Sequence, residues 1–203
     1  MIYLLAINGV MDNRFGILAN PKMGVPKGVR NGMYWAADMG AISGPPFVKK
    51  FNPDIAIPWL RSMEQFRSHC LWVLAPDIVG SATDTLEAFS CIEGWPTAFA
   101  AQDGQEHLPF PDNFSCLFVG GSTGWKVGPS ALSAIGRAQR LGKQIHIGRV
   151  NYWRRYEYFR GLPGGENFTC DGTRQRFQGS KRAMDAWLQY MDRPYTINME
   201  GLC

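Results

Sequence analysis

Residues 116–151 decide the fold of this chain, and they read CLFVGGSTGWKVGPSALSAIGRAQRLGKQIHIGRVN. The stretch begins with a short apolar run, Cys116–Val119, and a second apolar run occupies Gln144–Ile147. Between them, an amphipathic stretch begins at Pro129 and stops at Gly142, as a helix would. A strand, a helix and a strand in this order predict two parallel strands joined by a crossover helix.

The same alternation runs through the rest of the chain. Seven buried strands without a dinucleotide-binding glycine fingerprint predict an α/β fold, a compact (β/α)8-type TIM barrel in one domain over residues 1–203. Such barrels take about 250 residues, so we expect some helices to be missing or short, above all in the Gly-, Asn- and Lys-rich residues 8–33. Besides the two strands above, the expected strands are Ile2–Ile7, Tyr34–Ala37, Leu71–Ala75, Thr97–Ala101 and Phe168–Cys170, and the further helices run from Asn52 to Ser68, from Ser81 onward, from Asn151 to Arg160 and from Ser180 to Met191.

Composition and charge narrow the class of protein. The chain has 203 residues, of which 45% are hydrophobic, and a formal net charge of +4. This excludes a disordered chain and a strongly acidic surface protein. No apolar run approaches the roughly 18 residues of a membrane span, and the N-terminus lacks the basic start of a signal peptide. The five cysteines contain no Cys-x-x-Cys pair, so we expect reduced thiols in a cytoplasmic protein without a membrane partner.

Polar or glycine residues follow six of the expected strands. In a parallel barrel the carboxyl ends of the strands meet at one mouth, where active sites lie. We therefore expect one site there, with two adjacent glycines whose backbone N–H groups approach a flat or charged ligand. Its residues are Asp38, Asp77, Gln102, Gly120 with Gly121, Arg149 with Asn151, and Asp171.

The residue types at this mouth exclude several chemistries. Carboxylates and an amide, with three histidines that share no ligand spacing, exclude a zinc site, and Ser122 lacks the surroundings of a hydrolase nucleophile. The chain also has no phosphate-binding P-loop motif. Two or three aspartates at one mouth suit glycosidic-bond chemistry, in which one carboxylate attacks or stabilises the sugar carbon and another moves a proton.

A second constellation lies just beyond the Gln144–Ile147 strand. Residues 149–160 hold four arginines and five aromatic side chains, a set that suits phosphate contact and base stacking. The helical spacing of Tyr152, Tyr156 and Phe159 fits equally an amphipathic helix with its aromatic side inward. A further basic set, Arg137, Arg140 and Lys143, is expected on a solvated helix face.

Five short motifs together resemble the tRNA-guanine transglycosylase superfamily. They are WAADMGAISG around Asp38, LAPDIVG around Asp77, AQDG around Gln102, FVGGST at 118–123 and TCDGTR around Asp171. Their order over residues 34–177 is most similar to the small DNA-guanine transglycosylases of phages and of bacterial DNA-modification islands. The zinc-binding Cys and His set of the tRNA enzymes, and their C-terminal tRNA clamp, have no counterpart in this chain, which favours DNA over tRNA.

The resemblance implies a role for each matching residue. Asp171 is expected to be the nucleophile that attacks C1′ of the sugar, and Asp38 the general acid or base beside the leaving base. No metal or cofactor is implied, and the expected partner is DNA. The expected base-binding residues are Asp77, Gln102, Gly120 and Gly121, and the expected phosphate contacts are Arg149, Asn151, Lys126 and Arg174, with Arg176 as an alternative to Arg174.

Several outcomes stay open at the level of sequence. The enzyme either excises a base, as a DNA glycosylase does, or exchanges it for a free base such as a 7-deazaguanine. Trp125 and Tyr152 are candidates to stack against a flipped base, and core packing is the alternative for each. The same carboxylates also suit a small nucleoside or sugar phosphate, or a non-catalytic module that binds a modified base. The oligomeric state is not predicted.

Overall fold

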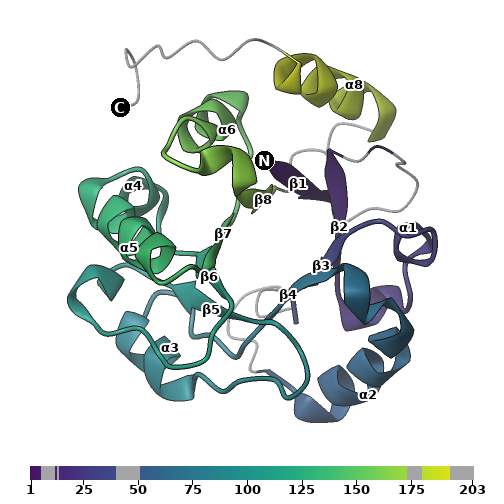
Figure 1. The fold of residues 1–203 in the computed structure, drawn as a ribbon, viewed down its shortest axis with the longest axis horizontal. Coiled ribbons are helices and arrows are strands. Elements are labelled where there is room, and N and C mark those ends of the chain that lie inside the picture. The colour runs from purple at the N-terminus through teal and green to yellow at the C-terminus, as the bar shows by residue number, and fades with distance from the viewer. Residues whose placement is uncertain (6–11, 13, 40–50, 173–179, 193–203) are drawn as a thin grey trace.

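The computed structural model describes residues 1–5, 12, 14–39, 51–172 and 180–192. Their strands form a closed barrel in which each strand is parallel to its neighbours. The last strand pairs with the first, with Cys170 opposite Tyr3, and this pairing closes the sheet. The strands, which form the ring at the centre of Figure 1, are β1 (Ile2–Leu5), β2 (Phe15–Ala19), β3 (Trp35–Ala37), β4 (Cys70–Leu74), β5 (Thr97–Ala101), β6 (Cys116–Val119), β7 (Gln144–Ile147) and β8 (Thr169–Asp171).

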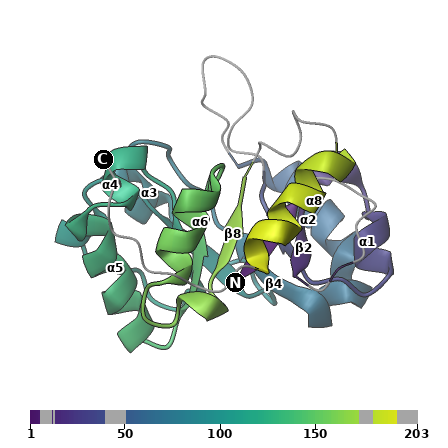
Figure 2. The same ribbon diagram turned by 90° about the horizontal axis from the view of Figure 1, so that it is seen from above.

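The helices lie outside this ring, as Figure 1 and Figure 2 show, and the predicted (β/α)8-type barrel is confirmed. Two predicted helix starts are capped by side chains: Asn52 accepts a hydrogen bond from the backbone N–H of Asp54 at 3.0 Å, and Ser81 accepts one from that of Asp84 at 3.2 Å. The α-helices are α1 (Lys27–Arg30), α2 (Pro53–Met63), α3 (Ala82–Ala88), α4 (Thr123–Lys126), α5 (Pro129–Arg140), α6 (Trp153–Arg160) and α8 (Ser180–Met191).

The strand β2 lies within residues 8–33, where the sequence predicted no strand. Its second residue is Gly16, and a Cβ atom there would lie 2.6 Å from the side chain of Leu4 and 2.9 Å from the carbonyl oxygen of Tyr34. Glycine is therefore required by the close approach of the neighbouring strands, and it interrupts the apolar pattern. Within the described residues of 8–33, helical structure is limited to the four-residue α1 and one 3-10 turn, as predicted.

The interior of the barrel is packed with side chains. Alternate residues of each strand point inward. The ring of Trp72 is fully buried, and its centroid lies 4.6 Å from that of His146 and 5.6 Å from that of Phe118. These rings make the barrel a core and not a channel. The inner cluster consists of Leu4, Leu18, Ala36, Trp72, Leu74, Ala98, Ala100 and Cys116.

The last helix, α8, packs against the first strand. The ring centroid of Trp187 lies 4.6 Å from that of Tyr3 in β1 and 5.5 Å from that of Tyr156 in α6. Aromatic contacts of this kind stabilise the pair beyond the burial of area, so they fix the C-terminal helix on the outside of the barrel. No helix in the described ranges has both the length and the apolar character needed to cross a membrane.

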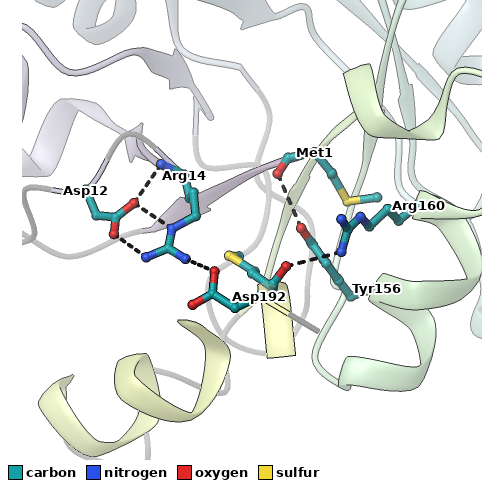
Figure 3. A network of polar contacts seen from close by, with 7 residues as sticks. Met1, Asp12, Arg14, Tyr156, Arg160 and Asp192 are labelled. Carbon is teal, nitrogen blue, oxygen red and sulfur yellow. Dashed lines mark hydrogen bonds and ion pairs between the residues drawn. The ribbon is translucent and has the colours of Figure 1, made fainter. Parts of the chain in front are cut away.

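A polar network surrounds the C-terminal end of α8 (Figure 3). Arg14 pairs with Asp12, at 2.6 Å between Nη2 and Oδ2, and also with Asp192. Arg160 of α6 donates to the carbonyl oxygen of Met191 at 3.3 Å. The side chain of Asp192 is 65% exposed, so these pairs orient the helix end more than they stabilise the fold.

Candidate active site

The predicted site residues lie where the inward-facing rows of the strands reach the mouth of the barrel. Ala36 in β3 and Ala100 in β5 belong to the inner cluster, so the period of two makes Asp38 and Gln102 the next inward positions. The same inward row in β8 leads to Asp171, the last residue of the strand. The inward-facing rows of β3, β5 and β8 thus place two carboxylates and one amide at the same mouth of the barrel.

Hydrogen bonds connect these strand ends, beginning at β8. The backbone N–H of Arg149, which follows β7, donates to Oδ1 of Asp171 at 2.8 Å. The guanidinium of the same arginine turns back and donates from Nη2 to the carbonyl oxygen of Gly121, after β6, at 2.6 Å. Arg149 has a φ of +60°, an uncommon conformation for a residue with a side chain, and these two bonds hold it there.

The connection continues across β5 to β4. The backbone N–H of Gly121 donates to Oε1 of Gln102 at 3.1 Å, and the amide nitrogen of Gln102 donates to Oδ2 of Asp77 at 3.3 Å. Gln102 is buried, so its amide is held at both ends. We call the residues Asp171, Arg149, Gly121, Gln102 and Asp77 the mouth chain. It runs over five consecutive strand ends and brings together most of the predicted site.

Asp77 and Asp38 form a coupled pair at the end of the mouth chain. Burial, with the negative charge of Asp38 as the second cause, raises the pKa of Asp77 to about 6. A cavity of about 10 Å³ lies against both residues, together with Met39 and Phe51. That volume is about the size of one water molecule. With the pKa of Asp77 raised in this way, one of the two carboxyls carries a proton at mildly acidic pH.

His146, which no sequence motif singled out as a site residue, contacts Asp171 from inside the barrel. Its ring is fully buried in β7, with Nε2 3.3 Å from Oδ1 of Asp171 and Nδ1 2.8 Å from Oγ1 of Thr169. Asp171 itself is largely buried, with 13% of its side chain exposed. Asp171 thus has two nitrogen neighbours on one oxygen, His146 below and the N–H of Arg149 beside it.

The predicted phosphate contacts divide into three cases. Arg149 directs its guanidinium to the protein's own backbone, as described above. Lys126 is 3% exposed, and its Nζ donates to the carbonyl oxygen of Gly148 at 2.7 Å, so its ammonium lies inside the protein and not on a DNA-facing surface. Asn151 is half-buried beside Gly172. Arg174, like Arg176, lies outside the described residues.

The glycines at the mouth do not have the role that the sequence predicted. The N–H groups of Gly120 and Gly121 donate to Ala101 and Gln102, so both are used within the protein. A Cβ atom on Gly121 would lie 2.5 Å from the ring of Trp125. The missing side chain thus makes room for neighbouring residues and not for a ligand.

The two candidate stacking residues have different surroundings. Trp125 is half-buried, and its indole N–H donates to Oε2 of Glu106 at 2.9 Å, which is the contact of a packing residue. Tyr152 is 52% exposed at the start of α6, with the guanidinium of Arg155 5.5 Å from its ring centroid. Only Tyr152 of this pair offers an exposed ring beside the mouth.

The basic residues of α5 line a groove of about 440 Å³ at the opposite end of the barrel. Arg137 is not simply solvated there, because it lies 4.3 Å from the ring centroid of Phe110 and donates to the carbonyl oxygens of Glu106 and Leu108. Lys143 lies 4.7 Å from the ring centroid of Phe114. The groove is therefore separate from the mouth chain.

Within the described ranges, no three His, Cys, Asp or Glu side chains gather as metal ligands would. Comparison of the chain with family models, with curated proteins and with solved structures finds no match in any of the three. Conclusions about activity therefore depend on the geometry of the mouth and on the resemblance of the sequence motifs.

Proposed function

We propose that this protein is an enzyme that cleaves the N-glycosidic bond between a base and deoxyribose in DNA, either excising the base or exchanging it for a free one. The observation that carries the proposal is the position of Asp171. Its carboxylate is held at the barrel mouth by the N–H of Arg149 at 2.8 Å, in the same mouth as the coupled pair of Asp38 and Asp77.

Asp171 has the surroundings of a nucleophile or of a charge stabiliser. Both of its nitrogen contacts, to Arg149 and to His146, are made by Oδ1. Oδ2 carries neither of them and is the oxygen we assign to C1′ of the sugar. When the bond to the base breaks, positive charge develops at C1′, and an oriented carboxylate either attacks this carbon or stabilises its charge.

Asp77 and Asp38 supply the proton that a departing base needs. The pKa of Asp77 near 6 means that the pair retains a proton at mildly acidic pH, while an ordinary exposed aspartate does not. The sequence resemblance assigns the acid role to Asp38 alone. The buried position of Asp77 favours a proton shared between the two carboxyls. Asp171 then acts on C1′ of the sugar, and the pair of Asp38 and Asp77 protonates the departing base. These are the two carboxylate roles that glycosidic cleavage requires.

The features around the mouth suit DNA as the substrate. A base in a duplex reaches such a site only after it is flipped out of the stack. The exposed ring of Tyr152, with Arg155 beside it, can stack on a base or fill the gap that the base leaves. The formal net charge of +4 predicts that DNA affinity falls as salt concentration rises.

The test is to incubate the protein with plain DNA and with DNA that carries modified bases, and to identify released bases by mass spectrometry. Excision leaves abasic sites, which break in alkali, whereas exchange in the presence of a free 7-deazaguanine leaves the strand alkali-stable and changes its mass. Release that is lost in Asp171→Asn supports the proposal. Cleavage of free nucleosides or nucleoside phosphates without action on any DNA would refute DNA as the substrate.

A further inference from the structure

Lys126 is a buried cation that the proposed mechanism does not use. Its side chain is 3% exposed, and its Nζ lies 2.7 Å from the carbonyl oxygen of Gly148. None of the ion pairs found between described residues includes it. Buried lysines are rare without an anionic partner, because removing an ammonium group from water is costly. The position therefore needs a reason beyond packing.

The partner of Lys126 leads directly to Asp171. The carbonyl of Gly148 belongs to the same peptide unit as the N–H of Arg149. In a planar trans peptide these two groups point in opposite directions. Lys126 thus binds one end of this peptide, and Asp171 accepts a hydrogen bond from the other end at 2.8 Å. A cation on the carbonyl oxygen polarises the peptide and strengthens its N–H as a donor.

We propose that Lys126 is a positioning residue for Asp171, acting through the peptide unit of Gly148 and Arg149 to hold the carboxylate in its orientation at the barrel mouth. The effect of Lys126 on catalysis rests on the proposed function. The electrostatic coupling between Lys126 and Asp171 does not depend on it. The hydrogen bond from Lys126 to the carbonyl oxygen of Gly148 also helps to hold the left-handed backbone conformation of Arg149. In this conformation the N–H of Arg149 points at Asp171.

This coupling can be switched off by pH. Burial lowers the pKa of Lys126 to about 8, so the ammonium loses its proton within an accessible range. The charged groups that face Lys126 are Arg149 and Arg155, which lower its pKa, and Asp171 and Asp103, which raise it. Above pH 8 the neutral amine predominates, so the positive charge beside the carbonyl oxygen of Gly148 is lost.

The decisive measurement uses the wild-type protein and needs no substrate. Carbon-13 spectra of the aspartate carboxyl groups are recorded between pH 3 and 10, with the Asp171 signal assigned from Asp171→Asn, and proton–nitrogen spectra follow the amide of Arg149. We expect both signals to shift with a common midpoint near pH 8, as Lys126 loses its charge. Signals of Asp171 and Arg149 that stay constant through this range would overturn the proposal.

Lys126→Met tests the same coupling by substitution, with Lys143→Met as the matched control at the other end of the barrel. In Lys126→Met the shift near pH 8 should vanish from the signals of Asp171 and Arg149, because no ammonium titrates at that position. Lys143→Met should keep the shift in both signals. A shift near pH 8 that persists in a folded Lys126→Met protein counts against the proposal.

The pH dependence of kcat for base release distinguishes a positioning role of Lys126 from a purely structural one. At pH 7 the kcat of wild type should exceed that of Lys126→Met by about tenfold, the effect expected when one hydrogen bond to a charged group is weakened. Above pH 9 the two kcat values should become nearly equal. A ratio that does not change with pH would overturn the positioning role. If the NMR coupling is present but no DNA releases a base, the proposed function fails and the coupling stands.

Discussion

Nε2 of His146 lies 3.3 Å from Oδ1 of Asp171, and the other nitrogen of the same ring lies 2.8 Å from the hydroxyl of Thr169. A carboxylate only accepts hydrogen bonds, so Nε2 donates to Asp171. The buried ring acts as a donor to the carboxylate from inside the barrel.

We expect His146→Phe to slow base release by roughly tenfold to a hundredfold, since a hydrogen bond to a charged group contributes about 1.5–3 kcal/mol. Phenylalanine keeps a ring of similar shape against Trp72 and Phe118, so the fold should persist. The measurements are kcat and the melting temperature, with His107→Phe as a control at a side chain that is 82% exposed. Wild-type rates in a folded His146→Phe protein would remove His146 from the site.

Asp171→Asn should abolish base release while it preserves the fold and DNA binding. An amide cannot attack C1′ or stabilise its positive charge as an anion does, so the loss should reach several orders of magnitude. Asp38→Asn should slow release less when the base is a good leaving group, because that base needs less protonation. The assay follows release, melting temperature and DNA affinity together.

The matched control for Asp171→Asn is Asp112→Asn, the same change at an exposed carboxylate by the opposite end of the barrel. It should leave release unchanged. If Asp171→Asn instead releases bases at nearly the wild-type rate, the nucleophile is misassigned, and Asp38 or Asp77 takes its place.

Most of the barrel is readable from sequence because its strands are buried on both faces. Runs such as Thr97–Ala101 and Cys116–Val119 are apolar and end at glycine or polar residues, and the structure has strands with these same bounds. β2 escaped because Gly16 breaks its run, and the need for glycine arises from Leu4, a contact with another strand. A contact between two strands cannot be predicted from the pattern of apolar residues within either strand.

The site was predictable only as far as strand ends reveal it. Asp77, Gln102 and Asp171 lie at the carboxyl ends of strands or within a few residues of them, so the barrel rule gathers them. His146 lies within a strand, where a polar residue usually means a satisfied core group, yet its alternation with Ile145 and Ile147 already places it on the inward side. The role of Gly120 and Gly121 was not predictable, because it depends on which atoms from other parts of the chain fill the space that a Cβ would take.

Gly172 illustrates this dependence and gives a stability test. A Cβ atom there would lie 2.0 Å from the hydroxyl oxygen of Tyr3 and 2.7 Å from the carbonyl oxygen of Val150. The hydroxyl of Tyr3, which donates to the carbonyl oxygen of Val150 at 2.8 Å, occupies the space that a side chain at this position would need. Gly172→Ala should therefore lower the free energy of unfolding by about 1–3 kcal/mol through overpacking.

A double-mutant cycle identifies the cause. Tyr3→Phe alone should cost about 1–2 kcal/mol, because it removes a buried hydrogen bond. It also removes the nearest of the atoms that the new Cβ in Gly172→Ala meets, so the double variant should be less destabilised than the two single effects added together. Urea unfolding measures all four proteins. Strict additivity would show that the hydroxyl of Tyr3 is not what excludes a side chain at residue 172.

Asp77 makes the stability of the fold depend on pH. Burial first, and the charge of Asp38 second, raise its pKa from 3.8 to about 6. Between these values the folded protein holds a proton that the unfolded chain has released. The contribution of a protonated Asp77 is therefore fully present below about pH 4 and is lost as the pH rises through 6.

Asp77→Asn removes this titration but keeps an oxygen that can accept from Gln102. At pH 7.5 the variant should be more stable than wild type by on the order of 2 kcal/mol, and the difference should shrink as the pH falls towards 4. Asp38→Asn should lower the pKa of Asp77 only in part, since burial is the larger cause. Urea unfolding at several pH values measures each variant, with Asp84→Asn as the control at an exposed carboxylate. A constant difference between wild type and Asp77→Asn across this range would show that Asp77 titrates alike in both states, and its role as the proton donor would then be withdrawn.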